Sequence, residues 1–172
     1  MTNIDLIAKN STAAFKVVVL CYGNPSRGDD ALAPSLYEHL VELFAEREDL
    51  LLVNDFQLQI EHILDISQAD LVLFIDAHSH CGAPFEFTPL QISHQLSHTS
   101  HALSPSHLLG FYQQSLGTLP PPAFILAIKG ESFELGESLS ASAQQNLTKA
   151  QTFVFKLLSD CQLSIWKSLI KE

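Results

Sequence analysis

The segment GNPSRGDD, residues 23–30, lies between an apolar run and a helix-like run. A phosphate-binding P-loop has the same layout, and its two glycines have the spacing of Gly23 and Gly28. A P-loop continues with a lysine and a hydroxyl residue, because these meet phosphate and magnesium. This chain has Asp29 and Asp30 there instead. Two carboxylates repel a phosphate, so an anion is not the expected ligand of this loop.

Two further residues form a possible site with Asp30. Asp76 ends the apolar stretch DLVLFIDA, and His101 lies in the segment before Ser104. Open parallel α/β sheets bind ligands beyond the carboxyl ends of their strands, where Asp30 and Asp76 are expected. Two carboxylates and an imidazole suit a first-row divalent metal and leave positions open for water or substrate. Water on such a metal can act as a nucleophile.

Each carboxylate also has a structural interpretation. Asp29 is most simply the N-cap of the following helix. Asp30 is equally compatible with a first-turn acid favoured by the helix dipole. Asp76 is compatible with an acid that caps the next turn. These alternatives stay open on the residues alone.

The histidines give a weaker signal. The chain has eight, and six fall between His78 and His107, so the position of His101 is unspecific. His107 is expected inside a helix as a surface or packing residue. His78 and His80 are expected to flank the site.

Other catalytic patterns are absent from the sequence, which has no GxSxG, CxxC, HExxH or GxGxxG. The three cysteines lie far apart, which argues against a disulfide framework or a zinc knuckle. Cys21 lies in an apolar strand and is predicted to be a core residue. A classical serine or cysteine hydrolase is therefore not expected.

The composition is that of a globular protein. Hydrophobic residues make up 47% of the 172 residues and charged residues 16%, which fits a single domain, 1–172, with a core of about residues 16–158. The net charge of −10 argues against nucleic acid and anionic lipid and favours a cationic partner, either a metal or a basic protein segment. No signal peptide or membrane-spanning run is apparent, so the cytoplasm is the expected location.

Strand and helix patterns alternate along the chain. Strands are predicted at Lys16–Tyr22, Leu50–Asp55, Asp70–Ala77 and Ala123–Ile128, with an edge strand at Pro84–Leu90. Helices are predicted at Asp30–Glu48, Ile60–Ala69, Pro105–Leu116 after an N-cap at Ser104, and from Ser138 or Ser140 to Ser159, with Cys161–Glu172 as a possible extension. This order predicts one three-layer α/β/α domain, with a mostly parallel, twisted sheet and helices on both faces.

Four segments together resemble the endopeptidases that mature the large subunit of [NiFe] hydrogenases. They are VVVLCYGNPSRGDDALAP (17–34), FQLQIE (56–61), LVLFIDA (71–77), and TSHALSPSHLL (99–109) followed by LPPPAFILAIKGESFELGESLS (119–140). The segment FQLQIE is similar to the branch that serves cytoplasmic, NAD-linked hydrogenases. No segment is specific alone, but their order and spacing match from about residue 16 to 158.

The resemblance implies residue roles. It implies that Asp30, Asp76 and His101 contact a metal and carry the catalysis, and that the offset of His107 is wrong for this role. It also implies that Gly23 and Asn24 shape the substrate-facing loop.

Gln57 and Leu58 are the residues that, by the same resemblance, help to choose the substrate. Two departures are Cys21 and Ala31, which stand where the family usually has glycine. Ala31 favours a helix that starts directly at the acids. Neither departure touches a proposed ligand.

The activity implied by the resemblance is removal of a short C-terminal extension from a nickel-loaded large-subunit precursor. The nickel belongs to the precursor, which is the protein partner, and serves as the recognition signal. No tightly bound cofactor of this chain is therefore expected, and neither nucleic acid nor a membrane is an expected partner. Nickel either polarises the scissile carbonyl or positions it, and Asp30 or Asp76 is an alternative general base. The alternative function is a non-catalytic, chaperone-like module that checks nickel loading. A third is a small-molecule hydrolase, which needs a closed pocket.

Overall fold

Five apolar segments pair into one sheet in the computed structural model, which describes residues 15–94 and 103–170. The strand order is β2-β1-β3-β5-β4. Four strands run parallel, namely β1 (Val17–Tyr22), β2 (Leu50–Asp55), β3 (Leu71–His78) and β5 (Ala123–Lys129). The edge strand β4 (Phe85–Pro89) is antiparallel to β5. Its Pro89 lies at the strand end, where a missing N–H is tolerated.

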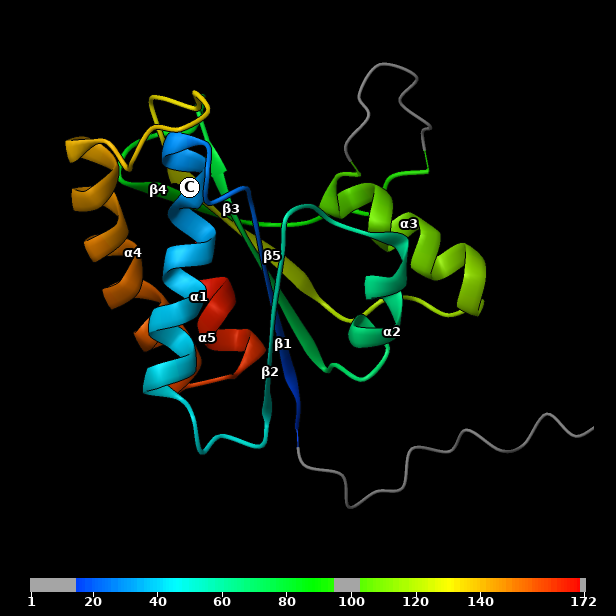
Figure 1. Cartoon of the computed structure of the whole chain (residues 1–172). Helices are drawn as coiled ribbons and strands as arrows, with labels where there is room; N and C mark the ends of the chain where they lie inside the picture. Colours follow the sequence, from blue (N-terminus) through cyan, green and yellow to red (C-terminus); the bar gives the residue numbers. More distant parts are fainter. Residues whose placement is uncertain (1–14, 95–102, 171–172) are drawn as a thin grey trace, which may run out of the picture.

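Helices cover both faces of this sheet (Figure 1). One layer holds α1 (Leu32–Leu43), α4 (Ala141–Ser159) and α5 (Leu163–Ser168). The other holds α2 (Ile63–Ile66) and α3 (Pro105–Leu116). Two 3-10 turns, η1 (Gly28–Ala31) and η2 (Ile60–His62), precede α1 and α2. The predicted three-layer α/β/α fold is confirmed.

The central strands are apolar without alternation because both of their faces are covered. Val17 and Val19 belong to the core under α1 and α4, whereas Val18 and Leu20 belong to the core under α2 and α3. All four side chains are at most 1% exposed. No helix in the described residues is long and apolar enough to cross a membrane.

The first two helices are shorter than predicted. The predicted Asp30–Glu48 helix is shorter, because its acids lie in the 3-10 turn η1 and the α-helix begins only at Leu32. The predicted Ile60–Ala69 helix is shorter as well, because α2 ends at Ile66. Ile60 and Leu64 are 46% and 62% exposed there, whereas Ile66 is fully buried.

The C-terminal tail is a separate helix rather than an extension of α4. The chain leaves α4 at Asp160, and α5 then packs against the sheet core. Trp166 is fully buried there and donates a hydrogen bond from Nε1 to the Leu157 carbonyl at 3.0 Å. Burial of the indole explains the turn, because a straight extension would leave Trp166 in water.

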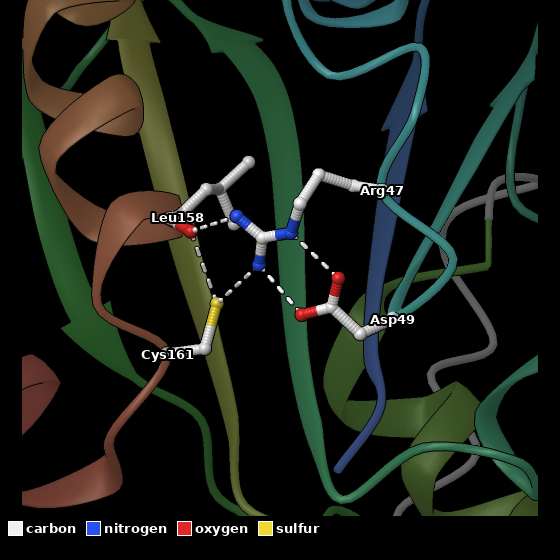
Figure 2. Close-up of polar contacts among 4 residues, drawn as sticks. All are labelled: Arg47, Asp49, Leu158 and Cys161. Carbon is white, nitrogen blue, oxygen red and sulfur yellow. Dashed lines mark hydrogen bonds and ion pairs between the residues drawn. The ribbon is translucent and has the colours of Figure 1, made fainter. Parts of the chain in front are cut away.

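Arg47 joins the turn between α1 and β2 to the end of α4 (Figure 2). Its Nε and Nη2 donate to the two carboxylate oxygens of Asp49, each at 2.6 Å. Nη1 donates to the Leu158 carbonyl at 3.2 Å, and Nη2 lies 3.8 Å from the Cys161 sulfur. The guanidinium thus satisfies a carbonyl that the last turn of α4 leaves without a helical partner.

Candidate functional site

The order of the strands reverses between β1 and β3, which are neighbours in the sheet. From β1 the chain crosses to β2 on one side, and β3 then pairs with the other side of β1. Such a switch point leaves a crevice outside the carboxyl ends of the two strands, and ligands of open α/β sheets bind there. Asp30 follows β1 and Asp76 lies near the end of β3, so both acids meet this crevice.

A cleft of about 420 Å³ opens at this point. Its lining comes from the end of β1 (Tyr22, Gly23), the segment after β2 (Phe56, Gln57, Leu58), the end of β3 (Asp76, Ala77, His78, Ser79), and Asp30, Leu103 and Phe133. Asp30 and Asp76 therefore share one cleft, as the sequence predicted. The cleft is open to solvent, unlike the closed pocket that a small-molecule hydrolase would need.

Gly23 and Asn24 hold Asp30 in place. A Cβ on Gly23 would lie 2.2 Å from the Asp30 carbonyl oxygen, so only glycine permits this close approach. The Asn24 backbone N–H donates to Asp30 Oδ2 at 2.7 Å. The Asn24 side chain in turn accepts from the Ser26 N–H at 2.9 Å, which closes the loop on itself. These contacts orient the Asp30 carboxylate.

The surroundings of Asp76 raise the pKa of its carboxyl group. Burial, and then the nearby Asp30 carboxylate, raise the pKa of Asp76 to about 7. The Tyr22 hydroxyl donates a hydrogen bond to Asp76, which opposes that rise. Two close carboxylates in a partly buried cleft repel each other, and a cation between them would relieve the repulsion. The pair is therefore suited to a cation.

Asp29 is not the N-cap that its position predicted. The residue before α1, Ala31, makes no side-chain cap, and Asp29 is fully buried. Its carboxylate accepts the backbone N–H groups of Glu131, Ser132 and Ser140 at 2.7–3.1 Å. The Ser140 hydroxyl donates to it as well, at 2.8 Å.

These hydrogen bonds decide the charge of Asp29. Burial alone would raise the pKa of Asp29, but the three backbone N–H groups and the Ser140 hydroxyl together hold it below its usual value. Asp29 thus anchors the 130–140 segment and the start of α4 under the GNPSRGDD loop. Its partners lie more than 100 residues away, so no local pattern could have revealed them.

Of the other predicted site residues, two line the cleft. His101 lies outside the described residues, so its role stays a prediction. Gln57 lines the cleft with an exposed side chain. Leu58 also lines it but is 4% exposed and belongs to the core, so it supplies the floor of the cleft.

His107 and Cys21 have the structural roles that the sequence predicted. His107 lies in α3, with Nδ1 at 2.8 Å from the Ser104 hydroxyl, and it does not line the cleft. Cys21 is 2% exposed, and burial raises the pKa of its thiol, as expected of a core residue. His78 lines the cleft, in keeping with its expected position beside the site, whereas His80 is not among the lining residues. Tyr22 also lines the cleft, and no sequence pattern indicated it.

Within residues 15–94 and 103–170, no group of three or more His, Cys, Asp or Glu side chains could hold a metal ion. Asp30 and Asp76 offer oxygen donors alone. Any cation between them needs further ligands from elsewhere, either His101 or a partner molecule.

Comparison with known proteins supports the fold. No protein-family model and no curated protein matches the chain. Among solved structures, the [NiFe] hydrogenase maturation protease HycI from Thermococcus kodakarensis KOD1 is 22% identical, with 87% of this chain and 96% of that chain covered and a TM-score of 0.67. The chain has the fold of the hydrogenase maturation proteases.

Two further solved structures agree with this fold. The hydrogenase maturating endopeptidase HybD from Escherichia coli is 16% identical, with 84% of this chain and 93% of that chain covered and a TM-score of 0.64. A hydrogenase 2 maturation peptidase from a Thaumarchaeota archaeon is 22% identical, with 83% and 97% covered and a TM-score of 0.59. This chain therefore spans nearly the whole length of these proteins.

Proposed function

We propose that this chain is an endopeptidase that removes the C-terminal extension of a nickel-loaded [NiFe] hydrogenase large-subunit precursor. The observation that carries the proposal is the pair Asp30 and Asp76, which share an open cleft at the switch point of the sheet. The likeness of fold to hydrogenase maturation proteases supports it. An open cleft also suits a folded protein substrate better than a small molecule.

In this proposal the nickel is part of the substrate. Asp30 and Asp76 would face the nickel with their carboxylates, and His101 would complete the set. The cation would favour the ionised form of Asp76, whose pKa burial and the Asp30 carboxylate raise to about 7. Nickel would then position or polarise the scissile carbonyl, or one carboxylate would activate the attacking water.

The test is the mass of a nickel-loaded precursor after incubation with the protein. The wild type should remove the extension, and Asp30→Asn and Asp76→Asn should each slow processing by at least about 100-fold. Asp160→Asn is a matched control at the end of α4, outside the cleft, and should process normally.

Two outcomes would contradict the proposal. If both cleft variants process at the wild-type rate, the site assignment is wrong. If the wild type binds the precursor without shortening it, the alternative holds, namely a chaperone-like module that checks nickel loading.

The branch of the family is a finer part of the proposal. The segment FQLQIE includes Gln57 and Leu58, which line the cleft. We therefore propose a cytoplasmic protein whose partner is the precursor of an NAD-linked hydrogenase. Such a precursor is the first substrate to use in the mass assay.

A further inference from the structure

His78 is the last residue of β3, two residues after Asp76. It lines the cleft that Asp30 and Asp76 share, which we call the acid cleft. Its backbone is fixed, because its carbonyl accepts the Gly130 N–H at 3.1 Å. Its ring is fixed as well, because Nδ1 accepts the backbone N–H of His80 at 3.1 Å. The imidazole is therefore held in a defined direction although it is exposed.

The contact with His80 also determines where the ring carries its proton. A backbone N–H can only donate, so Nδ1 of His78 must accept and carries no proton. In the neutral ring the proton then lies on Nε2. Within the described residues, no group accepts a hydrogen bond from this Nε2–H.

This tautomer directs a proton, rather than a lone pair, from Nε2 toward the cleft. To bind a metal through Nε2, the neutral ring would have to move its proton to Nδ1, where it would face the His80 N–H. The hydrogen bond that fixes the ring would be lost. With this hydrogen bond in place, His78 is a donor at the edge of the cleft.

A peptide carbonyl in this cleft that does not face the nickel gains from such a donor. Asp30 and Asp76 are acceptors when ionised, and the Tyr22 hydroxyl is already directed to Asp76. A peptide carbonyl that faced only these oxygens would be repelled. Nε2–H of His78 offers the carbonyl a partner whose direction the turn has already fixed, which lowers the entropic cost of binding.

We propose that His78 is a substrate-binding residue that donates a hydrogen bond from Nε2 to a backbone carbonyl of the precursor segment in the cleft. This inference rests on the proposed peptidase function. It adds a specific contact that neither the acid pair nor the segment FQLQIE supplies.

Two substitutions separate the two nitrogens of the ring. His78→Asn places an oxygen near the position of Nδ1, so it keeps the turn but loses the donor. His78→Gln places an amide N–H near the position of Nε2, so it keeps the donor. We expect His78→Asn to lower kcat/KM for precursor processing about tenfold, mainly through KM, and His78→Gln to stay within about threefold of the wild type. His80→Asn is the matched control, because its backbone N–H is unchanged, and it should behave as the wild type.

Two readouts keep the inference separate from the proposed function. The Kd of each variant for the uncleaved precursor measures the contact without catalysis and should rise about tenfold in His78→Asn. Long-range ¹H–¹⁵N spectra report the tautomer of His78 directly and should show a bare Nδ1. Three results would overturn the inference while wild-type processing stands. They are full activity and binding in His78→Asn, equal losses in the Asn and Gln variants, and a protonated Nδ1 in the neutral ring. A wild type that binds but does not cut would overturn the proposed function alone.

Discussion

Two adjacent acids in GNPSRGDD have different environments. Asp29 is fully buried and accepts four hydrogen bonds from residues of the 131–140 segment. Asp30 is half-buried, accepts the Asn24 N–H and faces the cleft. A buried carboxylate is tolerated only where N–H and O–H donors replace its water, and the backbone donors around Asp29 meet this condition. The first acid therefore holds the loop, and the second is free for a ligand.

We predict that the two acids contribute unequally to stability. Asp29→Asn should lower the free energy of unfolding by about 2–3 kcal/mol, because its amide group is forced against N–H donors that need an acceptor. Asp30→Asn should change it by less than about 1 kcal/mol, because the amide oxygen can still accept from Asn24. Urea unfolding of both variants measures this difference. Equal losses in the two variants would show that Asp29 is not the anchor of the loop.

The sequence predicted the position of Asp30 but not the role of Asp29. Asp30 follows the first apolar strand and Asp76 lies near the end of the third. Because the carboxyl ends of parallel strands meet at one edge, their shared cleft could be inferred from the order of the strands. The role of Asp29 could not, because its partners are distant in the chain. The donor role of His78 was equally hidden, because it depends on the turn geometry around His80.

At the scale of elements, helical spacing predicted α1 but not where it ends. Leu32, Leu36 and Leu40 are fully buried, as their i, i+4 spacing indicates. Val41 continues the apolar pattern but is 39% exposed, and the helix ends at Leu43. The chain must turn there so that Arg47 can reach Asp49 and Leu158. The contact with Leu158 spans 111 residues, so helical spacing could not predict it.

The Arg47–Asp49 pair gives a prediction about acid stability. The hydrogen bonds from Arg47 lower the pKa of Asp49 below its usual value. Because the folded state then binds this proton less readily than the unfolded chain, the pair stabilises the fold above the unfolded pKa of about 4. This stability is lost as the pH falls through the lower, folded value.

The measurement is the urea midpoint of the wild type and Asp49→Asn between pH 7 and pH 3. The variant should be less stable at neutral pH, and the difference should shrink below about pH 4 as the wild-type carboxylate takes up its proton. Glu48→Gln, at the exposed neighbouring position, should follow the wild type throughout. A difference that stays constant with pH would mean that Asp49 acts through packing rather than charge.

At the scale of the whole molecule, the acid cleft is part of a protein with a net charge of −10. Helices pack on both faces of the sheet (Figure 1). The cleft is lined by residues at the carboxyl ends of β1 and β3. A cation bound there would have the two carboxylates on the side of the sheet and open positions toward solvent. These positions suit ligands from a second protein, such as the cysteines of a hydrogenase precursor.

We therefore predict that the nickel needed for processing comes with the precursor. Two carboxylates, or three ligands with His101, leave much of the coordination sphere to the partner, so the protein alone should hold the metal weakly. Protein treated with a chelator and then desalted should process nickel-loaded precursor at an unchanged rate. Precursor without nickel should be processed at least about 100-fold more slowly by the same protein. The opposite result is that protein treated with chelator loses its activity and regains it when metal is added before the precursor. The metal would then be resident in this chain, and the proposal that nickel comes with the precursor would be wrong.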